Sequence, residues 1–215
     1  MNAVNFVLQV DTAGRVLRVG DLMSSQPLKL ILASQSPRRR RLLSESGYQF
    51  DVIVPSEAAE TGAEDLPAPE LVRRFAYRKA AEVAPQVEQG IVLGCDTVAE
   101  CGGQILGKPR NSADARAMLG LLRGRSQHVY SGLCLWRRPD DEVLTKVAVT
   151  KLHMEEISRT ELERYLNSGD WEGKAGGFGY QDRLGWLRIL HGSESNVVGL
   201  PLELFEEMLS DLTDS

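Results

Sequence analysis

Short apolar runs alternate with amphipathic segments along most of the chain, which predicts strands and helices in alternation. Residues 28–33 are apolar enough for a buried strand, and residues 50–54 and 91–93 repeat that pattern. Over residues 70–83 the apolar side chains recur at helical spacing, and Pro85 ends this predicted helix. We therefore predict an α/β fold.

The second half of the chain continues the alternation. The pattern predicts a helix at 113–122, paired strands at 129–137 and 142–154, a helix capped by Ser158 or Thr160, a strand at 186–190 and a last helix after Pro201. Between the last two helices, the glycine-dense segment 169–179 is expected to lack regular structure.

The first residues of the chain are predicted to form a separate extension. Residues 4–19 alternate apolar and polar positions around the turn sequence DTAG, which predicts a β-hairpin, and a linker at 21–27 follows. We divide the chain into an N-terminal extension, residues 1–27, and one domain, residues 28–215. With 215 residues and 42% hydrophobic composition, the chain can bury a full core and needs no disulfide or metal to fold.

Charge and cysteine content narrow the possible functions. The net charge of −5 argues against general binding to nucleic acid or to an anionic membrane. The three cysteines are odd in number and lack CxxC spacing, which favours reduced thiols, and Cys95 is expected to fill the core. Without an apolar span of about 20 residues or a signal-peptide pattern, a cytoplasmic location is expected.

Four consecutive arginines follow the first predicted strand. In LASQSPRRRR, residues 32–41, Ser36 is suited to cap a helix, Pro37 to begin it, and residues 42–43 to face the core. Residues 38–41 then fill the first turn, where free backbone N–H groups already carry partial positive charge. A phosphate-bearing ligand would resolve this conflict, although a solvated basic patch is the simpler alternative.

Acidic residues near the predicted strand ends are candidates for catalysis and metal binding. Asp96 is expected just beyond the strand at 91–93, where α/β sheets place their ligands, and it is the leading catalytic candidate. Glu57, Glu60 and Glu64 offer the hard oxygen ligands that Mg²⁺ prefers. The alternatives are a turn aspartate and solvated loop charges.

Two glycine-containing segments resemble nucleotide motifs without matching them. Residues 102–109 fit GxxxxGK, but Pro109 replaces the required Ser or Thr, so a tight hairpin turn is favoured, with Lys108 either free to reach a phosphate or simply on the surface. Residues 173–181 contain no GxGxxG, yet Lys174 and Gln181 are possible donors to a ligand unless this is a mobile loop. No HExxH or GxSxG motif supports a histidine metal site or an acyl-enzyme.

Five segments, taken in order, resemble the Maf family of nucleoside triphosphate pyrophosphatases. They read LASQSPRR at 32–39, GCDTV at 94–98, LGKP at 106–109, KAGGFGYQ at 174–181 and SNVVGLPL at 195–202. The resemblance runs from about residue 29 to residue 209 and excludes residues 1–27. It implies an elongated mixed sheet flanked by helices, similar to inosine triphosphate pyrophosphatases, in a homodimer.

The resemblance also implies a reaction and a set of site residues. The reaction is hydrolysis between the α- and β-phosphates of a nucleoside triphosphate with a divalent cation, Mg²⁺ or Mn²⁺. By family likeness Asp96 is the general base, and Glu60 and Asp96 hold the metal. The implied substrate contacts are Ser34, Ser36, Arg38, Arg39, Lys79, Lys108 and Lys174, with Gln181 at the base, because GFGYQ is similar to the branch acting on dTTP and UTP.

Other functions remain open from the residues alone. A non-catalytic nucleotide-binding regulator of cell division would use the same anion site and could dock a partner through residues 1–27. A nucleic-acid binder would use residues 38–41, but the acidic balance argues against it. We therefore expect a nucleoside triphosphate as partner, and neither nucleic acid nor membrane.

Overall fold

The computed structural model describes residues 29–62, 65–180 and 184–213. The predicted hairpin at 4–19 and the rest of the extension 1–27 lie outside the described residues, as do Glu64 and Gln181. Within the described ranges, no helix is both long and apolar enough to cross a bilayer.

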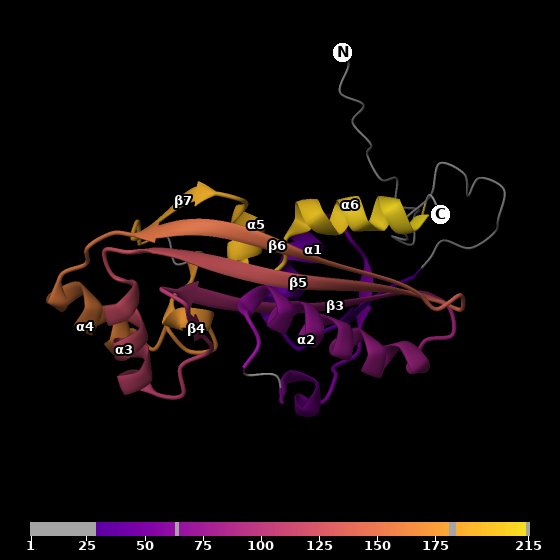
Figure 1. Ribbon diagram of the computed structural model, residues 1–215, viewed down its shortest axis with the longest axis horizontal. Helices are drawn as coiled ribbons and strands as arrows, with labels where there is room; N and C mark the ends of the chain where they lie inside the picture. The colour runs from indigo at the N-terminus through magenta and orange to yellow at the C-terminus, as the bar shows by residue number, and fades with distance from the viewer. Residues whose placement is uncertain (1–28, 63–64, 181–183, 214–215) are drawn as a thin grey trace, which may run out of the picture.

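A mixed sheet forms the centre of this elongated α/β domain, as predicted (Figure 1). The strands of the described residues are β1 Leu30–Ala33, β2 Phe50–Val52, β3 Gly90–Cys101, β4 Gln104–Leu106, β5 Ser126–Arg138, β6 Glu142–Met154 and β7 Leu187–His191. Their order is β2-β1-β3-β5-β6-β7, and β4 pairs with β3. The β1–β2 and β1–β3 pairs are parallel and the others antiparallel.

Helices cover both faces of the sheet (Figure 1). Their bounds are α1 Pro37–Glu45, α2 Ala68–Val83, α3 Ser112–Leu122, α4 Arg159–Ser168, α5 Glu194–Val198 and α6 Leu202–Thr213. Helix α2 lies on one face, and α1 and α6 pack on the opposite face around the buried Phe205. At the far end of the sheet, α3 and α4 enclose a second core.

The strand predicted at residues 91–93 is much longer than its apolar run. β3 extends to Cys101, because β5 pairs with it from Gly90 through Glu100. Asp96 therefore lies inside the strand, opposite Gly132 of β5, and the prediction that it follows the strand is wrong. A partner strand supplies backbone hydrogen bonds to polar positions that an apolar pattern does not reveal.

One edge of β3 is only partly paired. β1 pairs with residues 91–94 and β4 with residues 99–101, so in the described part of the chain residues 95–98 have no strand beside them on that edge. Gly102 and Gly103, with φ of 60° and 83°, make the predicted two-residue turn into β4. The segment that matched GxxxxGK is thus a hairpin.

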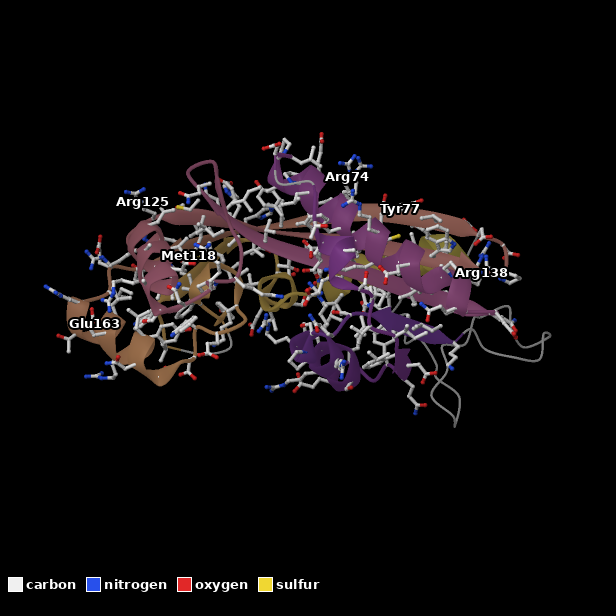
Figure 2. All side chains as sticks on the ribbon, turned by 90° about the horizontal axis from the view of Figure 1, so that it is seen from below. Arg74, Tyr77, Met118, Arg125, Arg138 and Glu163 are labelled. Atoms are coloured by element: carbon white, nitrogen blue, oxygen red, sulfur yellow. The ribbon has the colours of Figure 1, made fainter. Side chains whose placement is uncertain are left out.

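Helix α2 lies unusually close to the sheet because two glycines face it. A Cβ added to Gly132 would lie 2.2 Å from the Val72 carbonyl oxygen, and one added to Gly94 would lie 2.2 Å from that of Ala76. The predicted apolar face of the helix is buried. Figure 2 labels Arg74 and Tyr77 along one flank of the helix, where the Tyr77 ring packs on Trp136 of β5. This close packing brings the buried Lys79 to the centre of the sheet.

Several boundaries differ from the predictions where elements are short. The predicted loop 55–69 contains a 3₁₀ turn, Glu57–Glu60, and already includes the start of α2. The glycine-dense segment contains a 3₁₀ turn, Ala175–Gly177, and the five-residue α5 was not predicted. Turns of this length are too short to show a hydrophobic period. Of the two proposed caps, Ser158 begins α4, in a capping box with Glu161.

Candidate active site

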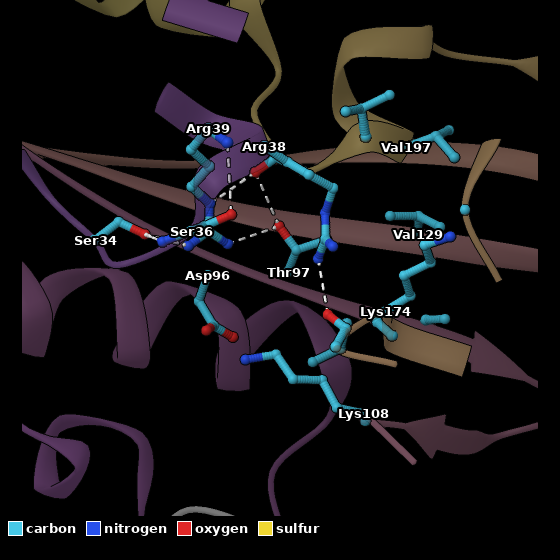
Figure 3. Close-up of a pocket in the computed structure, with 18 of the residues that line it drawn as sticks. Ser34, Ser36, Arg38, Arg39, Asp96, Thr97, Lys108, Val129, Lys174 and Val197 are labelled. Atoms are coloured by element: carbon cyan, nitrogen blue, oxygen red, sulfur yellow. Dashed lines mark hydrogen bonds between the residues drawn. The ribbon is translucent and has the colours of Figure 1, made fainter. Parts of the chain in front are cut away.

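A cavity of about 820 Å³ opens where the edge of β3 is unpaired (Figure 3). The loop from β1 into α1, the 3₁₀ turn Glu57–Glu60, β3, the segment after β4, the glycine-dense segment and α5 all contribute to its lining. Adjacent β3 residues point to opposite faces, so Asp96 lies on the α2 side and Thr97 on the α1 side. The open edge lets one cavity reach both side chains.

The start of α1 is built as predicted and fixes Arg39 in the cavity wall. Ser36 caps the helix, its hydroxyl accepting a hydrogen bond from the backbone N–H of Arg39, and Pro37 is the first helical residue. The buried guanidinium of Arg39 donates to the Gly199 carbonyl at 2.9 Å, the Ser34 hydroxyl at 3.1 Å and the Thr97 hydroxyl at 3.2 Å.

All three of these acceptors of Arg39 are neutral. A buried cation held only by neutral oxygens keeps its charge available to an anion, and a guanidinium is well shaped to bind phosphate. Arg39 therefore supports the phosphate site predicted from the arginine cluster.

The four consecutive arginines do not act together. Arg38 also lines the cavity and donates to the Gly173 carbonyl at 2.9 Å, linking α1 to the glycine-dense segment. Arg40 is exposed, and the exposed Arg41 pairs with Glu45 at 2.7 Å. The expectation that an anion is needed by the whole cluster is therefore corrected: Arg38 and Arg39 face the cavity, whereas Arg40 and Arg41 are solvated.

Lys79 joins two carboxylates on the other side of the cavity. Its Nζ lies 2.7 Å from Asp96 Oδ1 and 2.6 Å from Glu60 Oε1, and it also donates to the Cys95 carbonyl at 3.2 Å. Lys79 and Asp96 are 3% and 8% exposed. Within the described residues, Asp96 Oδ2 makes no hydrogen bond, so one oxygen of this carboxylate is held and the other is free.

Glu60 is the more exposed of the two acids. Burial opposes its charge, but the charge and hydrogen bond of Lys79, followed by the charges of Lys108 and Arg39, outweigh that effect and lower its pKa below 4.5. Glu60 is therefore ionised at neutral pH. Three basic side chains, Lys79, Lys108 and Arg39, therefore act on this one carboxylate of the cavity.

Two further lysines predicted for the site reach the same cavity. Lys108 follows β4 and is exposed, and in Figure 3 its side chain extends toward Asp96; no hydrogen bond holds its ammonium within the described residues. Lys174 lies in the glycine-dense segment, with its Nζ 6.0 Å from the centre of the Tyr165 ring. Both are placed to meet an anion that enters the cavity.

A buried hydrogen-bond network behind Arg39 was not predicted. The hydroxyls of Thr97 and Ser131 lie 2.8 Å apart, and Ser131 has no exposed surface. The Gly199 carbonyl accepts from Arg39 and Thr97 and, at 3.4 Å, from the Cys95 thiol, which is in the core as expected. The sequence signal that could have indicated this network is a polar residue at an inward-facing position of an otherwise apolar strand.

The far end of the cavity is apolar. Its walls come from α3, β5, β6, β7 and α5, and the side chains are Leu122, Val129, Leu152, Leu187 and Val197. Gln127 of β5 is the polar residue among them, buried and not singled out from the sequence. The cavity thus has a cationic end and an apolar end, which suits a ligand with a phosphate tail and a ring.

The two acidic residues proposed as metal ligands have the chemistry that magnesium requires. In the ranges that the structure describes, no group of three or more His, Cys, Asp or Glu side chains converges. Glu60 and Asp96 nevertheless share one ammonium, so their oxygens are close together. Mg²⁺ commonly binds through one or two carboxylates, with substrate phosphates and water completing its shell, so this pair fits such an ion.

The structure therefore brings together most of the predicted site. Ser34, Ser36, Arg38, Arg39, Glu60, Lys79, Asp96, Lys108 and Lys174 line one cavity. Glu57 lies at its border but is exposed, whereas Gln181 and Glu64 fall outside the described residues.

Comparison with known proteins gives matches over the same part of the chain. The family described as "Maf-like protein" matches residues 29–212. A protein named "dTTP/UTP pyrophosphatase" from Rhodopirellula baltica is 50% identical over 190 residues, covering 87% of this chain and 84% of its own. One of the same name from Dictyoglomus thermophilum is 39% identical over 186 residues, covering 86% and 96%.

Among solved structures, a HAM1 protein from Coxiella burnetii aligns with a TM-score of 0.49 and 17% identity, covering 87% of this chain and 100% of its own.

Proposed function

Because this chain belongs to the Maf family, we propose that it hydrolyses dTTP and UTP to the nucleoside monophosphate and pyrophosphate. The names of its relatives support this substrate class. The observation that carries the proposal is the position of Asp96: one oxygen is bound by Lys79, the other is free, and the residue lines the cavity that Arg39 also lines.

In the proposed reaction, the polyphosphate lies between the two basic sides of the cavity. Arg39, held by its three neutral acceptors, binds phosphate oxygens from the α1 side. Lys108 binds from the β4 side, and the N–H groups at the start of α1 add to the positive field. Binding by fixed charges accounts for much of the catalysis in phosphoryl transfer.

Asp96 then activates the attacking water. The free Oδ2 accepts a proton from water as the water oxygen attacks the α-phosphorus. The bond from the α-phosphorus to its bridging oxygen breaks, and pyrophosphate leaves with the electron pair. Lys79 fixes the orientation of Asp96 through the 2.7 Å contact.

We include a divalent cation, Mg²⁺ or Mn²⁺, in the proposal, with Glu60 and Asp96 as its protein ligands. When bound, such an ion neutralises phosphate charge as the leaving group departs. The chain's own contribution is to keep Glu60 ionised and to hold both acids close together beside Lys79. The role of Gln181 at the base and assembly as a homodimer remain predictions.

The test is a pyrophosphate assay with a panel of natural and modified triphosphates in the presence of Mg²⁺ or Mn²⁺. We expect pyrophosphate release from dTTP and UTP, and almost none from the Asp96→Asn variant. Release of orthophosphate alone would contradict the proposed bond cleavage. Tight nucleotide binding without turnover under either metal would instead favour the regulator.

A further inference from the structure

One buried polar side chain in the apolar end of the cavity has no assigned role. Gln127 lies on β5, is only 3% exposed and borders the cavity. Within the described residues, no hydrogen bond engages its side-chain amide. A ligand that fills this end excludes water from the amide, and an unpaired buried amide is costly, so the ligand must supply hydrogen-bond partners for it.

The strand register places Gln127 on the same wall as the hydroxyl network behind Arg39. Gln127, Val129 and Ser131 alternate along β5 and so share one face. Ser131 bonds Thr97, which bonds Arg39, so this face borders the phosphate end of the cavity. Asp96 pairs with Gly132, and Gln127 lies five residues from Gly132 along β5. At roughly 3.3 Å per residue, this is a separation of about 16 Å.

This separation suits a nucleotide lying along β5. With phosphates beside Arg39, a nucleoside along this strand would extend past Val129 and Leu152, which line the cavity, and its base would reach Gln127. Leu152 is directly opposite Gln127 on β6, so apolar surface surrounds the amide. The flat faces of a base fit these apolar walls, and its polar edge meets the amide.

We propose that Gln127 recognises the base, its amide oxygen accepting from a ring N–H and its amide N–H donating to a ring carbonyl. Uracil and thymine carry such a pair of groups side by side, and a glutamine amide carries the matching pair. This inference rests on the proposed function, since it takes a pyrimidine nucleotide as the ligand. Gln127 then contributes to selection of the base, while the arginines and lysines bind the phosphates.

The experiment compares binding of two probes by calorimetry: the α,β-methylene analogue of UTP, and inorganic tripolyphosphate, which has no base. The variant Gln127→Met keeps the length of the side chain and removes its hydrogen bonds. We expect affinity for the UTP analogue to fall about 10-fold and affinity for tripolyphosphate to stay unchanged. Gln86→Met, at an exposed glutamine outside the cavity, is the matched control and leaves both affinities unchanged.

A second variant, Gln127→Glu, keeps the test decisive if Gln127→Met does not fold. It retains the size of the side chain but sets a carboxylate against the ring carbonyl, so it also weakens binding of the UTP analogue more than binding of tripolyphosphate. Thermal unfolding verifies that each variant is folded. Equal losses for both probes, or no loss for either, would overturn the role of Gln127.

Pyrophosphate release by the wild-type protein separates this inference from the proposed function. If UTP is hydrolysed and Gln127→Met binds the analogue as the wild type does, the recognition role fails and the enzymatic proposal stands. If UTP is not hydrolysed but the base-dependent loss at Gln127 is found, the recognition role stands and the enzymatic proposal fails.

Discussion

Replacing Lys79 with methionine tests whether the buried ion cluster is assembled as described. The variant removes the ammonium shared by Asp96 and Glu60 and keeps a chain of similar length. Removing one partner of a buried ion pair costs about 3–5 kcal/mol, because the other charge is left unpaired. Asp96 borders the cavity, where solvent can reach it, so we expect about 3 kcal/mol of lost stability.

Glu60 adds little to this loss, because its side chain is 44% exposed and a salt bridge at such a position is weak. For a domain of this size, about 3 kcal/mol lowers the melting temperature by roughly 10 °C. The measurement is thermal unfolding of wild type and Lys79→Met at pH 7, with Lys151→Met at an exposed lysine as the control.

The double variant Lys79→Met/Asp96→Asn provides the decisive comparison. It removes both charges of the buried pair, so we expect it to be more stable than Lys79→Met alone. A melting temperature for Lys79→Met within about 2 °C of the wild type would show that Lys79 does not stabilise Asp96, and the reasoning would be refuted.

Four further variants probe separate features of the site and fold. Asp96→Asn is expected to lower kcat for pyrophosphate release by at least about 10²-fold, because general-base catalysis is lost; unchanged kcat would remove Asp96 from the mechanism. Arg39→Lys cannot donate to all three neutral acceptors in the guanidinium geometry, so KM for UTP should rise about 10-fold in steady-state kinetics. Glu60→Gln tests the pKa shift: because the folded pKa lies below 4.5, the stability that Glu60 contributes is complete above that pH and is lost as the pH falls through the lowered pKa. The difference in unfolding free energy between wild type and Glu60→Gln should therefore be level from about pH 7 to pH 5 and shrink below 4.5; a difference that grows on acidification would contradict the sign. Gly132→Ala forces a methyl group against the Val72 carbonyl and should cost about 2 kcal/mol in thermal unfolding, whereas a neutral effect would mean that α2 moves away freely.

Much of the fold follows from patterns that the sequence carries locally. Ser36 and Pro37 begin α1 because capping and the fixed φ of proline act within one turn. The paired strands β5 and β6 were predicted nearly in full. The length of β3 was not, because the residues after Leu93 depend on pairing with β5, a partner distant in the sequence.

Part of the candidate site was likewise predicted from the sequence, and the rest depends on contacts between distant parts of the chain. Arg39 was recognised because consecutive arginines at the start of a predicted helix indicate an anion site. Asp96 was recognised because an acidic residue follows a short apolar strand in the sequence. The contact of Lys79 with Asp96 depends on how closely α2 approaches the sheet, which Gly94 and Gly132 permit. Gln127 carries no motif, and its position at the cavity results from the strand register.

The hydrogen bond from Arg39 to the Gly199 carbonyl has a consequence for synthesis of the protein. The two residues are 160 positions apart, so during translation Arg39 is made well before this buried acceptor. A chain released before Gly199 therefore lacks part of the support for the guanidinium that we propose binds phosphate. Assembly of the proposed phosphate site therefore depends on synthesis of the chain through Gly199.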